Sequence, residues 1–258
     1  MNRQAPERFT QWLTENQHHD DRTGLVYRYH GRSDRHSRAL CRLILEDLIG
    51  VCHVLGRHAQ SRKVVYRINL RHQWPQSGKT KTLDLAIGLG EADSIPSPMT
   101  VPILEGTIHR VLISLEAKSV MTEHVKAQPR VFDELSSSHV IVHSGDNQAL
   151  AAGVTVVNIS KRFVSPLRQV VGQPTRWTEH RQPDVSRRMV EHLRGLPIRT
   201  SLEQAGFDGY ITLVVDCDNQ NPSSLWTDPP APQPGDRDHY DTFLDDLARG
   251  YSERFFDL

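Results

Sequence analysis

Residues 111–118 alternate between apolar and polar side chains with the two-residue period of a β-strand. The positions expected on its buried face are Val111, Ile113, Leu115 and Ala117. The opposite face ends in Glu116 and Lys118. The pattern therefore predicts a strand that packs one side in the core and presents a carboxylate and an ammonium group, two residues apart, on the other.

Residues 82–87 repeat this arrangement about thirty positions earlier. The apolar positions expected to share a face are Leu83, Leu85 and Ile87. If the two strands pair with their faces matched, Asp84, Glu116 and Lys118 converge on one polar cleft. Because Mg²⁺ takes oxygen ligands and shares them with a bound phosphate, two carboxylates and a lysine are suited to hold this cation and a phosphate group.

An Asp on one strand followed by Glu116-Ala117-Lys118 on the next resembles the PD-(D/E)XK superfamily of metal-dependent nucleases, which includes most restriction endonucleases. The resemblance covers roughly residues 33–160, about half of the chain. Leu83 stands where the family's name has Pro, a position at which relatives often lack Pro as well. The resemblance implies an α/β fold with a restriction-endonuclease-like αβββαβ core, in which a mixed central sheet is flanked by helices.

The periodicity of the chain predicts the same order of elements. We expect a helix over residues 33–57, capped by Ser33 or Asp34, and strands over 64–70, 82–87 and 111–118, with a loop over 88–107. A helix follows, capped by Thr122, kinked or restarted at Pro129 and ended by serines 136–138. A short apolar run at 139–143 and a buried strand at 153–159 complete the core.

The two ends of the chain are expected to extend this core. Residues 1–32 are predicted as an N-terminal arm with a helix over 8–15, and residues 33–218 as the nuclease-like domain. The histidines and aspartates at 18–21 could hold a metal, although an exposed turn is favoured. A helix over 184–195 and a strand over 210–215 precede a linker loop at 219–238. In the C-terminal helix, 239–258, the stripe expected to dock on the domain is Tyr240, Phe243, Leu244, Leu247, Tyr251 and Phe255.

Composition narrows the functional classes. The 258 residues carry 31 basic and 31 acidic side chains, so a nucleic-acid site must be a local patch, and a histone-like binder is disfavoured. The chain lacks both an apolar run of about 18 residues and a signal-peptide core at its amino terminus, which predicts no membrane association. Its three cysteines are widely spaced, so neither a disulfide framework nor a zinc site is expected, and a cytoplasmic location is predicted.

The resemblance also implies roles for individual residues. Asp84 and Glu116 would bind one or two Mg²⁺, for which Mn²⁺ substitutes, and the carbonyl group of Ala117 would complete the ligand shell. Lys118 would orient the nucleophilic water or neutralise the scissile phosphate. A carboxylate on the first helix often joins the metal in this family, so Glu46 is a candidate ligand. Asp47 competes with it, and a surface role for Glu46 remains an equal alternative.

Polar residues just past the predicted site could bind substrate. These residues are His124, Lys126, Gln128 and Arg130. They could contact phosphates or position water, or they could simply form a solvated helix face. Base readout is expected from loops such as 88–107 or 165–184.

The resulting hypothesis is a Mg²⁺-dependent endonuclease that hydrolyses phosphodiester bonds of double-stranded DNA, as a type II restriction-like or other defence nuclease. A homodimer is expected, because paired cuts across a duplex need two active sites. Three alternatives remain open: a signal-activated defence effector, a repair nuclease or junction resolvase, and a non-catalytic nucleic-acid-binding module of the same fold.

Overall fold

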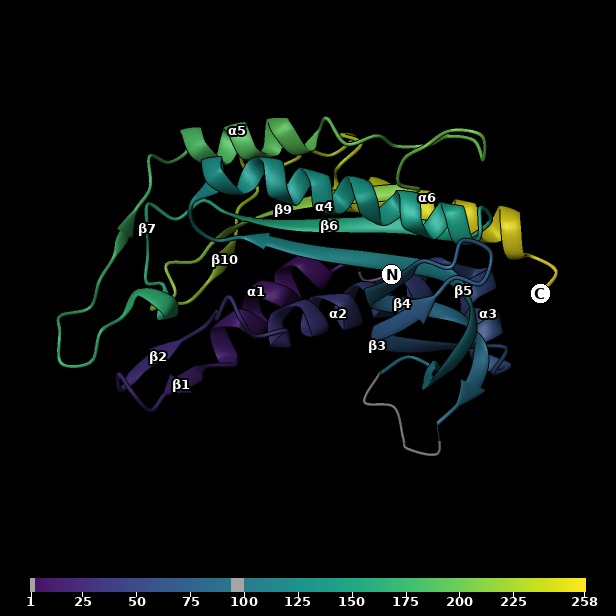
Figure 1. Ribbon diagram of the computed structural model, residues 1–258, viewed down its shortest axis with the longest axis horizontal. Helices are drawn as coiled ribbons and strands as arrows, with labels where there is room; N and C mark the ends of the chain where they lie inside the picture. The colour runs from purple at the N-terminus through teal and green to yellow at the C-terminus, as the bar shows by residue number, and fades with distance from the viewer. Residues whose placement is uncertain (1–2, 94–99) are drawn as a thin grey trace.

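A mixed β-sheet with α-helices on both faces forms the centre of the molecule in the computed structural model, which describes residues 3–93 and 100–258 (Figure 1). Within these residues the sheet has six strands in the order β10-β9-β6-β5-β3-β4, and β4 also pairs with β5. β5, β6 and β9 run parallel, whereas β3–β4, β4–β5 and β9–β10 are antiparallel. The predicted α/β class, with a mixed sheet flanked by helices, is confirmed.

The helices are α1 (Ala5–Glu15), α2 (Arg35–Val51), α3 (His53–Gln60), α4 (His124–Gly145), the 3₁₀ turn η1 (Pro166–Arg168), α5 (Asp184–Leu193) and α6 (Tyr240–Phe255). The sheet strands are β3 (Val64–Gln73), β4 (Thr80–Ala92), β5 (Leu104–Val120), β6 (Leu150–Asn158), β9 (Gly209–Asp216) and β10 (Ser224–Leu225). Two small ribbons lie outside the sheet, β1 (His18–Asp20) with β2 (Leu25–Tyr27), and β7 (Arg162–Phe163) with β8 (Thr178–Glu179).

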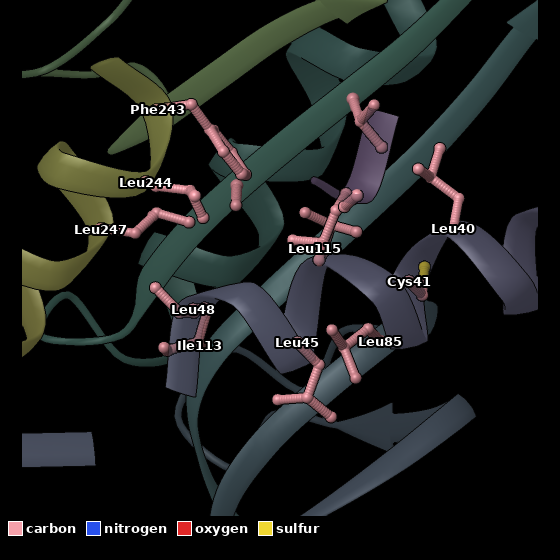
Figure 2. Packing of buried hydrophobic residues seen from close by; sticks show 14 of the residues in the cluster. Leu40, Cys41, Leu45, Leu48, Leu85, Ile113, Leu115, Phe243, Leu244 and Leu247 are labelled. Carbon is pink, nitrogen blue, oxygen red and sulfur yellow. The ribbon is translucent and has the colours of Figure 1, made fainter. Parts of the chain in front are cut away.

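The larger core cluster lies between the sheet and helices α1, α2, α3 and α6. Apolar side chains of α2 recur at three- and four-residue steps, so they form one stripe that faces the sheet. Leu45 and Leu48 of this stripe lie over β4 and β5, and α6 adds its own leucines from the side (Figure 2). The predicted docking stripe of the C-terminal helix is confirmed, since all six of its residues are buried.

A second cluster covers the opposite face of the sheet. Helices α4 and α5 contribute the apolar side chains Val131, Leu135, Val142, Met189 and Leu193. The sheet is therefore closed from both sides, as an α/β layer arrangement requires. The carboxyl end of β5 points toward the same end of the molecule as the β1–β2 and β7–β8 ribbons (Figure 1).

The β4–β5 pair is irregular, which changes which residues share a face. Ile87 pairs with Ile113 but Gly88 pairs with Val111, so the register shifts by one residue. A Cβ on Gly88 would collide with the carbonyl oxygen of Arg110, which explains why glycine occupies this position. As a result Val111 packs in the second cluster and not with Ile113, so the single predicted face is wrong there. Leu83 also packs in the second cluster, apart from Ile87.

Several predicted boundaries are wrong. The helix expected over 33–57 divides at Cys52 into α2 and α3. Serines 136–138 do not end α4, which runs on to Gly145, because Leu135 and Val142 on either side are buried against the sheet. Residues 139–143 are therefore helical. The loop expected over 88–107 is shorter, since β4 continues to Ala92 and β5 begins at Leu104; its central residues 94–99 lie outside the described ones.

The segments outside the predicted core are packed against it. α1 begins earlier than predicted, and Phe9 and Leu13 reach the main cluster. Residues 18–20 form β1 and not a turn. The region 219–238 includes β10, which pairs with β9. No helix of the described residues is long and apolar enough to cross a membrane.

Candidate active site

Asp84 and Glu116 face each other across the β4–β5 ladder. The last regular pair is Leu85 with Leu115, which places Asp84 opposite Glu116 at the next step. One oxygen of Asp84, Oδ2, accepts a hydrogen bond from the backbone N–H of Ala117 at 2.7 Å. The side chain of Asp84 thus takes the place of a ladder carbonyl and joins the two strands. We call these two residues the acid pair.

Burial sets the charge state of the acid pair. Desolvation and the neighbouring charge of Glu116 raise the pKa of Asp84 to about 6, and the hydrogen bond from Ala117 only partly offsets them. Glu116 is itself 5% exposed. Two carboxylates held this close in a desolvated position repel each other, so a positive charge between them is strongly favoured.

Two lysines supply positive charge on either side of Glu116. The ammonium nitrogen of Lys118 lies 2.7 Å from Oε1, and that of Lys81 lies 3.0 Å from Oε2. The Lys81 contact is an ion pair without hydrogen-bond geometry, so Oε2 is a buried acceptor without a hydrogen-bond partner in the described structure. Oε2 is therefore held by the charge of Lys81 alone, and a bound cation would compete with Lys81 for this oxygen.

A second acidic residue positions Lys118 from above the sheet. Glu134 on α4 lies 3.0 Å from the Lys118 ammonium nitrogen and 3.0 Å from a guanidinium nitrogen of Arg130. Burial would lower the pKa of Lys118, but Glu116 and Glu134 outweigh it and raise that pKa. Lys118 is therefore cationic at neutral pH and is fixed between a strand carboxylate and a helix carboxylate.

The donor set fits a magnesium ion that relies on substrate and water for part of its shell. Asp84 and Glu116 offer carboxylate oxygens, and Oε2 of Glu116 is buried with no hydrogen bond, in an ion pair with Lys81. Within residues 3–93 and 100–258 no cluster of three or more His, Cys, Asp or Glu side chains has the arrangement of a metal site. A cation held by Asp84 and Glu116 would take its remaining ligands from water and substrate.

The candidate ligands on α2 are engaged elsewhere. Glu46 forms an ion pair with Arg8 of α1 at 2.6 Å. Asp47 is buried and accepts hydrogen bonds from the backbone N–H of Ala5 and the hydroxyl of Tyr240, both at 2.8 Å. Because α2 covers the face opposite α4, these carboxylates anchor the two terminal helices and are not brought to the acid pair.

The predicted substrate-binding residues of α4 fall into two groups. His124 is 2% exposed and its Nε2 lies 2.7 Å from the carbonyl oxygen of Asn158, so it is a structural residue and not the substrate contact expected. Burial lowers its pKa to about 4, which keeps it neutral. Lys126 and Arg130 are exposed and Gln128 is half-buried.

Sequence reasoning missed Lys81 and Glu134. Lys81 lies three residues before Asp84, and the alternation of β4 gives no signal that it turns toward Glu116. Glu134 stands four residues after Arg130 on a helix, a spacing that indicates an ordinary surface ion pair. Only the packing of α4 over the carboxyl end of β5, which the sequence pattern does not specify, brings Glu134 to Lys118.

Comparisons with known proteins add no family or fold assignment: no family model, no curated protein and no solved structure matches the chain.

Proposed function

We propose that this protein is a Mg²⁺-dependent endonuclease that hydrolyses phosphodiester bonds of double-stranded DNA. The observation that carries the proposal is the convergence of Asp84, Glu116 and Lys118, with both carboxylates largely desolvated and one oxygen of Glu116 held by an ion pair alone. Repulsion within the acid pair favours a divalent cation over two protons at neutral pH.

The order of elements gives independent support. The chain runs from α2 and α3 through β3, β4 and β5 to α4 and β6. This is the αβββαβ order of the PD-(D/E)XK nucleases, and the acidic residues stand on the second and third of those strands. The position of the acidic motif and the order of the elements are independent of each other. Because both agree with the resemblance, each supports the proposal separately.

Each residue of the candidate site has its own proposed role. Asp84 and Glu116 would hold the cation, with the carbonyl group of Ala117 as a further ligand. When bound, Mg²⁺ supplies Lewis acidity that makes its water more acidic and stabilises negative charge on the phosphate. Lys118 donates hydrogen bonds to the attacking water or to a phosphate oxygen, and Glu134 keeps its ammonium group in place.

A cleavage assay tests this proposal. Purified protein is incubated with mixed-sequence plasmid DNA, with Mg²⁺, with Mn²⁺ and with EDTA. We expect cleavage with either metal and none with EDTA, and a loss of at least about a hundredfold in Asp84→Ala, Glu116→Ala and Lys118→Ala, because each removes stabilisation of the transition state. Matched controls are Glu91→Ala at the exposed end of β4 and Lys79→Ala in the turn before it, which should cleave at the wild-type rate.

The form of the products distinguishes the open alternatives. Discrete fragments indicate a restriction-type enzyme, a smear indicates a broad effector, and preferred cleavage of RNA corrects the substrate. Full activity in a correctly folded Lys118→Ala variant contradicts the assignment. A wild-type protein that binds duplex DNA equally well with and without Mg²⁺, and never cuts it, supports the non-catalytic binding module.

A further inference from the structure

Residues 161–182 form an extended arm that leaves the body of the molecule beyond β6 (Figure 1). The arm contains the β7–β8 ribbon and the η1 turn. Its cations, all exposed, are Lys161, Arg162, Arg168, Arg176 and Arg181. Glu179 is its one acidic residue. Because the whole chain has no net charge, this arm is a local concentration of positive charge.

Side-chain contacts hold the arm in a defined conformation. Gln169 is buried and ties its two sides together: its amide donates to the carbonyl groups of Ser165 (2.9 Å) and Arg176 (3.0 Å), and its oxygen accepts from the Arg176 backbone N–H (2.9 Å). The guanidinium group of Arg162 lies over the ring of Trp177, 4.2 Å from its centroid. The cations are thus presented from a preorganised backbone, which lowers the entropic cost of binding.

The base of the arm is attached just past the carboxyl end of β5, the strand that carries Glu116 and Lys118. The Nε2 atom of His180 lies 3.1 Å from the hydroxyl of Thr122, which is four residues past Lys118. Arg168 forms an ion pair with Glu123 at 2.5 Å. The arm's positive surface therefore continues toward the end of β5 and the first turn of α4, where Lys126 is also exposed.

We propose that the 161–182 arm binds the phosphate backbone of the DNA duplex and directs it to the acid pair. This rests on the proposed function, in that the duplex is the substrate of Asp84 and Glu116. Among the described residues Arg168 is the arm's one cation in an ion pair and Arg162 lies over Trp177, so Lys161, Arg176 and Arg181 are free to contact phosphates. Exposed Leu167, Val170 and Val171 would also suit a protein partner, but five cations against one carboxylate favour a polyanion.

The test measures DNA affinity as a function of salt. Binding of the full-length protein to a short fluorescent DNA duplex is followed by anisotropy in EDTA, so that cleavage does not intervene. The triple variant K161Q/R176Q/R181Q removes three exposed cations that make no ion pair with described residues. The control triple R57Q/R62Q/K63Q removes three exposed cations around α3, at the opposite end of the molecule (Figure 1).

We expect the arm variant to bind at least about tenfold more weakly at moderate salt, and the slope of log affinity against log salt to fall by up to about 3, as loss of three phosphate contacts requires. The control should keep the wild-type slope. Equal affinity and slope in the arm variant and wild type, or equal losses in both triples, would overturn the role of the arm.

Asp84→Ala separates the two proposals. We expect it to bind the duplex like wild type while failing to cut it, since the arm is intact. If the arm variant binds DNA normally, while wild type cuts DNA and Asp84→Ala does not, only the arm proposal fails. If wild type neither binds nor cuts the duplex, both proposals fail.

Discussion

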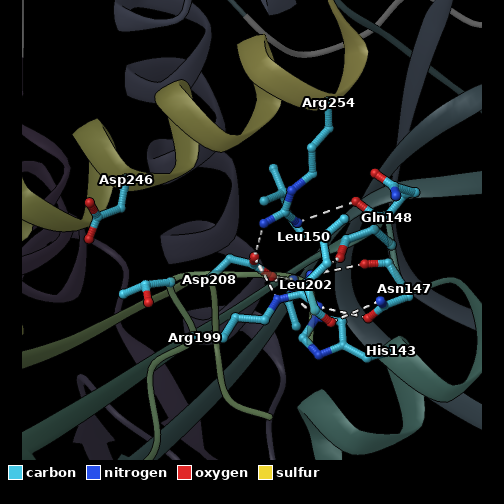
Figure 3. Close-up of polar contacts among 12 residues, drawn as sticks. His143, Asn147, Gln148, Leu150, Arg199, Leu202, Asp208, Asp246 and Arg254 are labelled. Atoms are coloured by element: carbon cyan, nitrogen blue, oxygen red, sulfur yellow. Dashed lines mark hydrogen bonds and ion pairs between the residues drawn. The ribbon is translucent and has the colours of Figure 1, made fainter. Parts of the chain in front are cut away.

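Two largely desolvated aspartates, Asp208 and Asp84, are in opposite electrostatic states. Asp208, at the start of β9, accepts hydrogen bonds from Arg199 (2.9 Å) and Arg254 (2.5 Å), and lies 3.2 Å from Nε2 of His143 (Figure 3). Burial alone would raise its pKa, but His143, Arg199 and Arg254 outweigh burial and lower the pKa to about 2. Asp84, half-buried, is desolvated and faces another carboxylate, and its pKa is raised to about 6.

We interpret this difference as one between a structural carboxylate, Asp208, and a candidate functional carboxylate, Asp84. The Asp208 cluster, which comprises Asp208, Arg199, Arg254 and His143, is a closed network that connects α4, the segment before β9 and α6. Such a network stabilises the arrangement of its elements and has no capacity left for a ligand. The acid pair retains repulsion and an unsatisfied oxygen, features that cluster at functional sites.

The largest expected effect on stability comes from removing the carboxylate of the Asp208 cluster. Asp208→Asn leaves the fully buried guanidinium group of Arg199 without its counter-charge, so we expect the free energy of unfolding to fall by about 3–5 kcal/mol. Urea denaturation measures it. The control is Asp246→Asn on α6, whose ion pair with Arg249 is at the surface and whose loss should cost less than about 1 kcal/mol. Equal stability of the two variants would contradict the contrast drawn between the aspartates.

A smaller effect of opposite sign is expected from Asp84→Asn in the metal-free protein. The unfolded chain releases this proton near pH 3.8 and the native state near pH 6, so the native state binds more protons between these values. The contribution of Asp84 to the free energy of unfolding therefore falls as pH rises through this window. Relative to wild type, the free energy of unfolding of the variant should rise from pH 4 to pH 6. Above pH 6 the difference between the two proteins should stay constant.

The same urea titrations, made across this pH range, should give the reverse dependence for Asp208. Its folded pKa of about 2 lies below the ordinary value of 3.8, so its stabilisation is complete above pH 4 and is lost as pH falls toward 2. A wild-type protein whose stability relative to Asp84→Asn is the same at pH 4 and pH 6 would show that Asp84 has an ordinary pKa.

The smallest expected effect is on metal affinity and concerns Lys81, the lysine beside the acid pair. Lys81 lies 3.0 Å from the unsatisfied oxygen of Glu116 and competes there with any cation. Lys81→Met removes this positive charge, so we expect Mn²⁺ to bind roughly five- to tenfold more tightly in a calorimetric titration. Lys79→Met, in the exposed turn before β4, is the control and should leave the affinity unchanged. Weaker binding in Lys81→Met would show that Lys81 supports the metal site instead of competing with it.

Much of the fold could be predicted because its information is local. The alternation around Asp84 and Glu116 and the helical stripes of α2 and α6 depend on residues a few positions apart. Boundaries failed where tertiary packing decided them. α4 continues through three serines because Leu135 and Val142 on either side are buried against the sheet.

The candidate site was predictable only in part. Asp84, Glu116 and Lys118 follow from strand period and pairing, and the structure brings them together. Glu46 and His124 could not be assigned from sequence, because their partners Arg8 and Asn158 are 38 and 34 residues away. Such contacts depend on how helices are oriented on the sheet, which periodicity does not specify.

The most direct test of the central claim is a calorimetric titration of the purified protein with Mn²⁺ at neutral pH, with Asp84→Asn and Asp246→Asn beside it. We expect saturable binding to wild type and to Asp246→Asn, and its loss in a folded Asp84→Asn variant, because Asp84 supplies half of the acid pair. Binding that survives in Asp84→Asn, or no binding to wild type, would contradict the assignment of Asp84 and Glu116 as a metal site.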